Sequence, residues 1–232
     1  MQKKLSNKLC FYLLISMRLL NAITLNEVKA VKSLSNYNEL KNIKVKEVVN
    51  IEKIERNKRY NKVYVIGENL PFSGAAITYF PNKRIEGISF YKEGKLENSA
   101  YLYASNGQLI LRTPYFNDKQ HGKGYEYADN GKLRCNNEFN NNIEIFSECY
   151  NADGSLFQRY KGISSKKGVL TGHYEGLNKK SFESEVIQDF SKKGITNYIR
   201  NGKTTVYERN GSILGELNFN NDSLLGAKAK II

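Results

Sequence analysis

Apolar positions recur about every 24 residues in the middle of this chain, each time within the same short phrase. The phrase is YASNGQL at 103–109, YADNGKL at 127–133 and YNADGSL at 150–156. Each copy begins with tyrosine and ends with leucine, and between them lie mostly small or polar residues with a glycine at the fifth position. A fixed period of this length predicts an array in which one supersecondary unit is stacked repeatedly.

The phrase predicts a β-hairpin with a three-residue loop. In YASNGQL, residues 105–107 would form a type I turn, with Gly107 in the left-handed conformation that glycine adopts at little energetic cost. Tyr103 would then face Leu109 and Tyr101 would face Leu111, all on one side of the sheet. In YADNGKL the same rule pairs Tyr127 with Leu133, and it pairs Tyr125 with Cys135.

The tyrosine period extends beyond the three clean copies. Lys83 replaces the glycine in the first copy, YFPNKRI, and the last two copies, YEGLNKK and YIRNGKT, lack the closing leucine. YERNGSI at 207–213 follows the last copy after only nine residues, which we interpret as shortened strands near a terminal cap. The predicted structural positions of the repeat are Tyr79, Tyr103, Gly107, Leu109, Tyr127, Gly131, Leu133, Tyr150, Gly154, Leu156, Tyr174 and Tyr198.

A second turn-rich cluster lies half a period after several of the phrases. FYKEGKLE at 90–97, YFNDKQHG at 115–122 and FNNNIE at 139–144 each place an aromatic residue before Lys, Asn, Asp or Gly. Two turns per repeat leave strands of about eight residues. The sequence therefore predicts an all-β protein: an elongated, twisted antiparallel meander of about six stacked hairpins and roughly twelve strands, with a tyrosine stripe buried on one face.

The array is expected at 62–225, before a C-terminal tail at 226–232. Residues 1–22 combine the basic MQKKLSNK with the apolar LCFYLLISM and end at Ala22, which predicts a signal peptide; an uncleaved anchor or a misassigned start codon are the alternatives. The Lys-rich segment 23–61 carries no repeat and forms a short irregular N-terminal segment. Its stretch 43–54 fits either a strand or a short helix.

The charge of the chain is +13, with 36 basic residues, of which only nine are arginine. Base and phosphate recognition favours arginine, so we expect no nucleic-acid partner. Lysine, asparagine, isoleucine and tyrosine are frequent together, and we attribute the excess of lysine to the codon drift of an A+T-rich genome. The three cysteines form no metal-ligand pattern. Counting two residues on from Leu133 places Cys135 on the buried face, and Cys149, next to Tyr150, falls on the opposite face. We therefore predict no disulfide between them.

The phrases resemble the variant MORN repeat of bacterial YwqK-type proteins. The family pattern combines a Pro-Phe-Ser/Thr-Gly opening, here at 71–74, with Tyr-x-x-Asn-Gly-x-Leu phrases, and a glycine often introduces the next strand, as at Gly122 and Gly172. The resemblance covers residues 62–225 and is specific for the first four copies. It implies hairpin arrays that mediate protein contacts, and the relatives are labelled antitoxins of toxin–antitoxin pairs.

We find no catalytic signature in the sequence. His121 and His173 lack a second ligand or a nucleophile motif nearby, so both are expected to be solvated or packed against turns. The carboxylates considered as an acid pair are expected in outward or turn positions; they are Glu144, Glu148, Asp153, Glu183 and Glu185.

The sequence thus predicts a non-enzymatic scaffold that needs no cofactor, metal or small-molecule substrate. Its partner would be another protein, met where the hairpin tips vary, at Lys83, Lys119, Asn141 and Lys179. The alternative is a protein exported to the periplasm or cell envelope that binds an anionic partner such as lipid headgroups at a membrane surface. From the predicted signal peptide we expect export to the periplasm or cell envelope, with a cytoplasmic location as the alternative.

Overall fold

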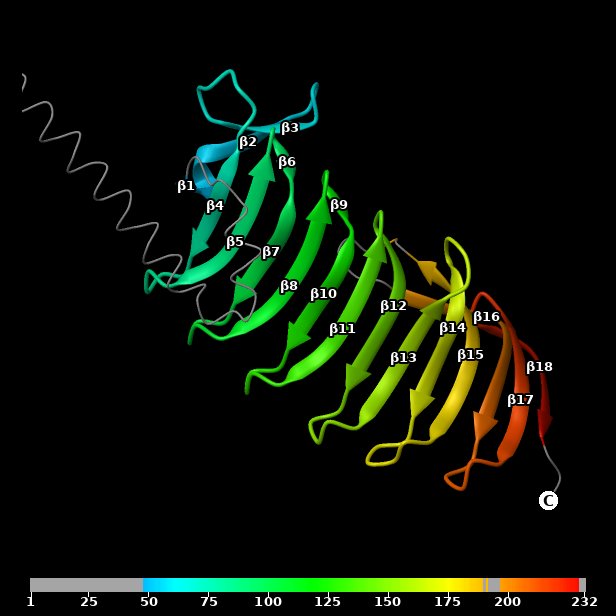
Figure 1. Ribbon diagram of the computed structural model, residues 1–232. Helices are drawn as coiled ribbons and strands as arrows, with labels where there is room; N and C mark the ends of the chain where they lie inside the picture. The colour runs from blue at the N-terminus through cyan, green and yellow to red at the C-terminus, as the bar shows by residue number, and fades with distance from the viewer. Residues whose placement is uncertain (1–47, 190, 192–196, 230–232) are drawn as a thin grey trace, which may run out of the picture.

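The computed structural model describes residues 48–189, 191 and 197–229 of the 232-residue chain. Most of these residues lie in β-strands that follow one another across a single long, twisted sheet (Figure 1). The predicted all-β, elongated hairpin array is confirmed. The predicted signal peptide at 1–22 lies outside the described residues. The strands are β1 Val48–Asn50, β2 Ile54–Asn57, β3 Lys62–Val65, β4 Gly74–Tyr79, β5 Ile85–Lys92, β6 Lys95–Leu96, β7 Asn98–Tyr103, β8 Leu109–Phe116, β9 Lys119–Gln120, β10 Gly122–Tyr127, β11 Leu133–Asn140, β12 Ile143–Tyr150, β13 Leu156–Gly162, β14 Lys167–His173, β15 Lys180–Asp189, β16 Asn197–Tyr207, β17 Ile213–Asn220 and β18 Ser223–Ala229.

The main sheet has 16 strands within the described part of the chain, and its order follows the sequence from β4 to β18. β6 and β9 are short continuations that pair with β5 and β8. All neighbours are antiparallel except β1 and β4, which run parallel because the chain leaves the sheet between them. In that interval a 3-10 turn, η1 (Ile51–Lys53), leads into the separate two-stranded sheet of β2 and β3. The stretch 43–54, ambiguous from its sequence, thus contributes strand and 3-10 structure where it is described.

The turns alternate between the two long edges of the sheet. At one edge lie the glycine-closed loops: Gly107, Gly131 and Gly154 all have φ between 79° and 91°. In the second copy the Gly107 N–H donates to the Ala104 carbonyl at 2.8 Å. At the other edge two successive residues have positive φ, as at Asn117–Asp118, Asn141–Asn142 and Asn221–Asp222. Such two-residue turns match the right-handed twist of antiparallel strands.

Each glycine-edge hairpin carries a β-bulge beside its tyrosine. Tyr103 pairs with Leu109 as predicted, but Leu102 pairs with Leu111, so Ile110 is an extra residue on β8. A bulge of this kind leaves two residues opposite one and shifts the register beyond it. Tyr101 consequently faces Arg112, and the prediction that it faces Leu111 is wrong. The same shift occurs next to Tyr79, Tyr127, Tyr150, His173 and Tyr207.

The bulge also explains why the prediction about the cysteines is wrong. Arg134 is the extra residue between Leu133 and Cys135, so Cys135 pairs with Glu126 rather than with Tyr125. Cys135 therefore lies on the face opposite Leu133, which is the face of Cys149. The two cysteines are direct cross-strand partners with Cα atoms 4.1 Å apart, and they form a disulfide.

The periodicity assigned to the last two copies is wrong as well. Tyr174 lies in a turn, where its N–H donates to the Lys179 carbonyl, and His173 occupies the position that tyrosine holds in the other copies. β16 continues through YIRNGKT with a register irregularity at 201–203 and forms no loop there, so Tyr198 faces Gln188 near the start of the strand. The sixth loop is instead YERNGSI, in which Tyr207 pairs with Ile213. Because β15 and β16 are longer than the other strands, this loop comes later in the sequence than the 24-residue spacing predicts.

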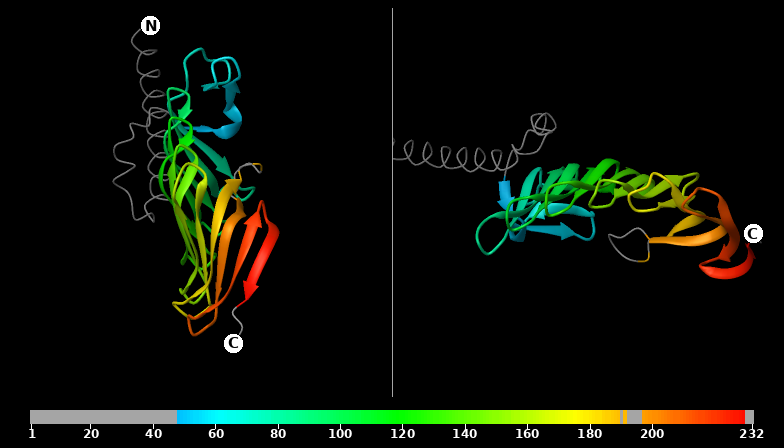
Figure 2. Two further views of the ribbon diagram at one scale, coloured as in Figure 1. Left: turned by 90° about the vertical axis from the view of Figure 1, so that its right-hand side faces the viewer. Right: turned by 90° about the horizontal axis from the view of Figure 1, so that it is seen from below.

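The two faces of the sheet differ in what covers them. We call the face that carries Ile88, Tyr101, Arg112 and Tyr125 the groove face, and the face that carries Ala76, Cys135, Cys149 and Tyr160 the arm face. Register and the alternation of side chains place these residues. β2–β3 and the far ends of β15 and β16 project from the same side of the sheet (Figure 2).

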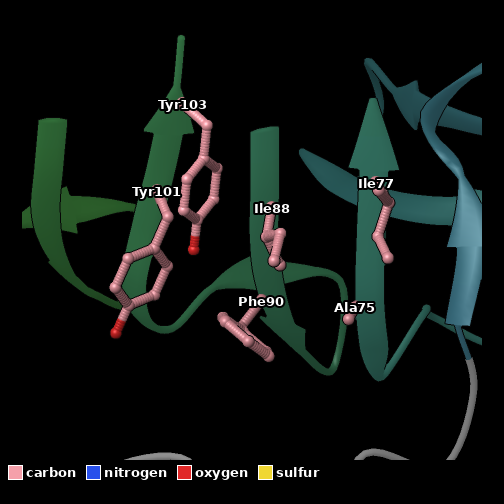
Figure 3. Packing of buried hydrophobic residues seen from close by; sticks show 6 residues of the cluster. All are labelled: Ala75, Ile77, Ile88, Phe90, Tyr101 and Tyr103. Carbon is pink, nitrogen blue, oxygen red and sulfur yellow. The ribbon is translucent and has the colours of Figure 1, made fainter. Parts of the chain in front are cut away.

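The hydrophobic core is concentrated at the N-terminal end. On the groove face, isoleucine and aromatic side chains from β4, β5 and β7 form one buried cluster (Figure 3). On the arm face, Val63 and Phe72 pack on Val49 and Ala76 and attach β2–β3 to the sheet. The tyrosine stripe is buried less completely than predicted: Tyr103 is 5% exposed and Tyr79 is 42% exposed, while Tyr127 and Tyr150 are half-buried. The members of the groove-face cluster are Ala75, Ile77, Ile88, Phe90, Tyr101 and Tyr103.

Candidate functional site

A groove crosses the groove face from β7 to β12. Its larger part has a volume of about 650 Å³, and a smaller hollow of about 190 Å³ adjoins it at Lys123 and Tyr125, which line both. The larger part is lined by Glu97, Asn98, Ser99, Arg112, Pro114, Tyr115, Phe116, His121, Gly122, Lys123 and Tyr125. The smaller hollow adds Asn136, Asn137, Glu138 and Phe146.

The groove lies where the β8–β10 ladder is short. These strands pair only at two positions, where Tyr125 faces Arg112 and Glu126 faces Leu111. Proline has no N–H to donate to a ladder, so Pro114, two residues after Arg112 on β8, cannot extend the ladder by a hydrogen bond. At Gly124 a Cβ atom would lie 3.1 Å from the Arg112 carbonyl oxygen and 3.2 Å from Pro114 Cδ, so a residue without a side chain fits best.

The groove combines aromatic surface with charges of both signs. The Arg112 guanidinium lies 5.6 Å from the centre of the Tyr125 ring, a cation–π arrangement that fixes both groups. At the other end Phe116 is 58% exposed, and the His121 ring lies 6.1 Å from it. Arg112 and Lys123 supply positive charge, while Glu97 and Glu138 supply negative charge. The groove is therefore amphipathic and close to neutral.

A hydrogen-bond network continues the same face beyond the groove. Tyr150 donates its hydroxyl to Glu148 at 2.8 Å and accepts from Asn136 at 3.3 Å. Arg159 Nε donates to the other Glu148 oxygen at 2.7 Å. Burial alone would raise the pKa of Glu148, but the hydrogen bonds from Tyr150 and Arg159 hold it below its ordinary value. This network orders the middle of the sheet and leaves Glu148 ionised and paired.

The five candidate carboxylates do not form one acid pair. Glu144 is buried on the arm face, at 3% exposure, so its expected outward position is wrong. Its pKa is raised to about 7, above all by burial. Each carboxylate has a different partner: Tyr198 for Glu144, Arg159 for Glu148, Ser155 for Asp153, Lys180 for Glu183 and the Lys203 N–H for Glu185.

The two histidines lie in different surroundings. His121 is exposed at the wall of the groove. His173 is half-buried, and its Nδ1 atom has no hydrogen-bond partner among the described residues. Burial, together with nearby Arg159 and Lys180, lowers the pKa of His173. It is therefore held as the neutral imidazole near pH 7.

The predicted tip residues divide between the two edges of the sheet. Lys83 and Lys179 lie at the glycine-closed edge, while Lys119 and Asn141 lie at the edge of two-residue turns. They do not form one surface. The groove, which uses none of them, was not predicted, although the Thr-Pro-Tyr-Phe run ending at Phe116 and the glycines at 122 and 124 could have indicated an interrupted ladder.

The described residues contain no cluster of His, Cys, Asp and Glu that could hold a metal ion. No helix in the described part of the chain is long and apolar enough to cross a membrane. Comparison with models of protein families and with curated proteins found no match.

Proposed function

We propose that this chain is a non-enzymatic repeat scaffold that binds another protein along the groove on β7 to β12. The YwqK-type proteins that its phrases resemble suggest the antitoxin-like half of a pair as the biological setting. The observation that carries the proposal is the groove itself, a hollow that is lined by a tyrosine in cation–π contact with an arginine and by an exposed phenylalanine. Aromatic residues and arginine dominate the energetic centres of protein interfaces.

Near-neutral charge and open shape favour a protein segment over a small ligand. A small-molecule site typically encloses most of its ligand, whereas this groove lies across the surface of several strands. An extended partner segment could place an apolar side chain against Phe116 and Pro114, with polar groups facing Asn136 and Lys123. This arrangement uses the groove along its whole length.

The test is capture of the native partner with matched baits. Phe116 and Phe157 are both exposed phenylalanines, at 58% and 52%, but only Phe116 lines the groove. Phe116→Ala should lose a captured partner that the wild-type protein and Phe157→Ala retain, with the far-ultraviolet circular dichroism of all three unchanged. A partner held equally by both variants would place binding elsewhere and contradict the proposal.

A second candidate function is an exported envelope protein with an anionic partner. The Cys135–Cys149 disulfide supports it, because disulfides persist mainly in oxidising compartments. N-terminal sequencing of the protein from a fractionated native cell tests it: a chain beginning near Ile23 in the envelope fraction is the expected result. An intact Met1 form confined to the cytoplasm would remove it. Sedimentation with anionic vesicles, lost as salt is raised, would identify lipid headgroups as the partner.

A further inference from the structure

The far ends of β15 and β16 extend past the array as an arm. Their pairing continues through Gln188–Tyr198 and Asp189–Asn197, past Ile187, the last residue of β15 that pairs with β14, and the Gln188 N–H donates to the Lys166 carbonyl at 2.8 Å. From there Gln188 and Tyr198 reach β12 and β13 on the arm face. Two views show this end turned to the side of the sheet that also carries β2–β3 (Figure 2).

The arm is held by a small buried polar cluster. Gln188 Nε2 donates to the Tyr160 hydroxyl at 2.7 Å and to the Glu144 carbonyl, and its Oε1 accepts the Glu144 N–H at 3.3 Å. The Tyr198 ring stacks on Tyr160 with centroids 4.7 Å apart, and its hydroxyl donates to the Glu144 carboxyl. Tyr160, Glu144 and Gln188 are all less than 5% exposed.

We propose that the ends of β15 and β16 form a pH-sensitive arm, which the neutral carboxyl of Glu144 holds against β12 and β13 and which the ionised carboxylate weakens. A carboxylate in this position is costly because it is removed from water, and no cation is among the described groups that act on it. The titratable and charged groups that act on it are Tyr198 on β16, Tyr160 on β13 and Glu126 on β10. β15 contributes only the neutral Gln188, and β12 contributes the Ser147 hydroxyl.

The direction of the effect follows from these surroundings. Burial and the negative charge of Glu126 raise the pKa of Glu144 to about 7, against the opposing hydrogen bonds from Tyr198 and Ser147. When the arm opens, Glu144 meets water and regains its ordinary pKa. The closed arm thus binds the proton more tightly, so arm closure is strongest at acid pH and weakens as pH rises from about 4.5 to about 7. Opening uncovers the Tyr160 ring on the arm face.

Amide hydrogen exchange of the full-length protein measures arm opening directly. After correction for the intrinsic pH dependence of exchange, protection of 186–189 and 197–200 should fall between about tenfold and about a hundredfold from pH 5 to pH 8. Protection of the β7–β8 hairpin should change far less. Glu144→Gln should remove the pH dependence of the arm, because the amide does not titrate. Glu148→Gln, on the same strand but the opposite face, should retain it.

A second variant keeps the test decisive if Glu144→Gln does not fold. Tyr198→Phe retains the stacked ring but removes the hydroxyl donor to the carboxylate, so the transition should move to higher pH. The proposal is overturned if wild-type arm protection changes no more than that of β7–β8. It is equally overturned if Glu144→Gln keeps the wild-type profile, or if Tyr198→Phe leaves the midpoint in place.

Discussion

The first loop of the array offers a sharp test of how these hairpins are closed. Lys83 occupies the position of Gly107 and has φ of 64°, in the left-handed region that the other copies fill with glycine. The loops are otherwise alike: the Lys83 N–H donates to the Phe80 carbonyl at 2.8 Å, and the Gly107 N–H donates to the Ala104 carbonyl at 2.8 Å. Lys83→Gly should therefore change only the free-energy cost of holding residue 83 in the left-handed backbone conformation.

The magnitude follows from the backbone. The left-handed conformation costs a residue with a Cβ roughly 1–2 kcal/mol, and the greater freedom of glycine in the unfolded chain returns about 0.4–1 kcal/mol of that. Lys83→Gly should stabilise the protein by about 0.5–1 kcal/mol. Gly107→Lys should destabilise it by a similar amount, because no atom lies within 4 Å of a Cβ added at Gly107 and steric clash does not contribute.

Urea unfolding followed by circular dichroism at equal m-values provides the measurement. Lys119→Gly is the matched control: this exposed lysine lies in β9 without positive φ, so its replacement should cost about 0.5–1 kcal/mol. If Lys83→Gly and Lys119→Gly destabilise the protein alike, position 83 has no cost that glycine relieves, and the first loop is not equivalent to the others.

Three further changes test other parts of the structure. Reduction of the Cys135–Cys149 disulfide, which spans a separation of 14 residues, should lower the free energy of unfolding by about 3 kcal/mol; an unchanged urea midpoint in reductant would contradict the pairing. Gly172→Ala would place a Cβ 2.2 Å from Phe182 Cε1, so a loss of about 1–3 kcal/mol is expected in thermal or urea unfolding, whereas a neutral result would show that the ring moves freely. The free energy of unfolding of the wild-type protein should decline by up to roughly 3 kcal/mol as pH rises from about 4.5 to 7, because the folded state retains the Glu144 proton to higher pH than the unfolded state does. Unfolding curves measured over a series of pH values test this, and Glu144→Gln should remove most of the decline.

The sequence predicted the elements of this fold better than their register. Glycine has an unmistakable role in a tight loop, so the positions of Gly107, Gly131 and Gly154 followed directly from the phrase. The extra residue beside each tyrosine has no such signature: Ile110 and Arg134 are ordinary strand residues. Because the prediction lacked this extra residue, the expected partners of Tyr101 and Tyr125 were wrong by one position, and Cys135 was expected on the wrong face.

Other features depend on contacts that no local pattern encodes. Tyr198 fits the 24-residue spacing, yet the strand pair that contains it is longer than the others and packs on β13. Glu144 looked like an outward carboxylate because its burial comes from the arm, which is distant in sequence. The groove arises from Pro114 and Gly124 acting together on adjacent strands, so it becomes visible only once their alignment is known.

One bulged, glycine-closed hairpin is repeated through the single main sheet of this protein. Cross-strand backbone NOEs in the isotope-labelled protein test it most directly, because they report register at each copy. We expect contacts between Tyr101 and Arg112 and between Glu126 and Cys135. Contacts between Tyr101 and Leu111 and between Tyr125 and Cys135, the register of hairpins without the bulge, would contradict it.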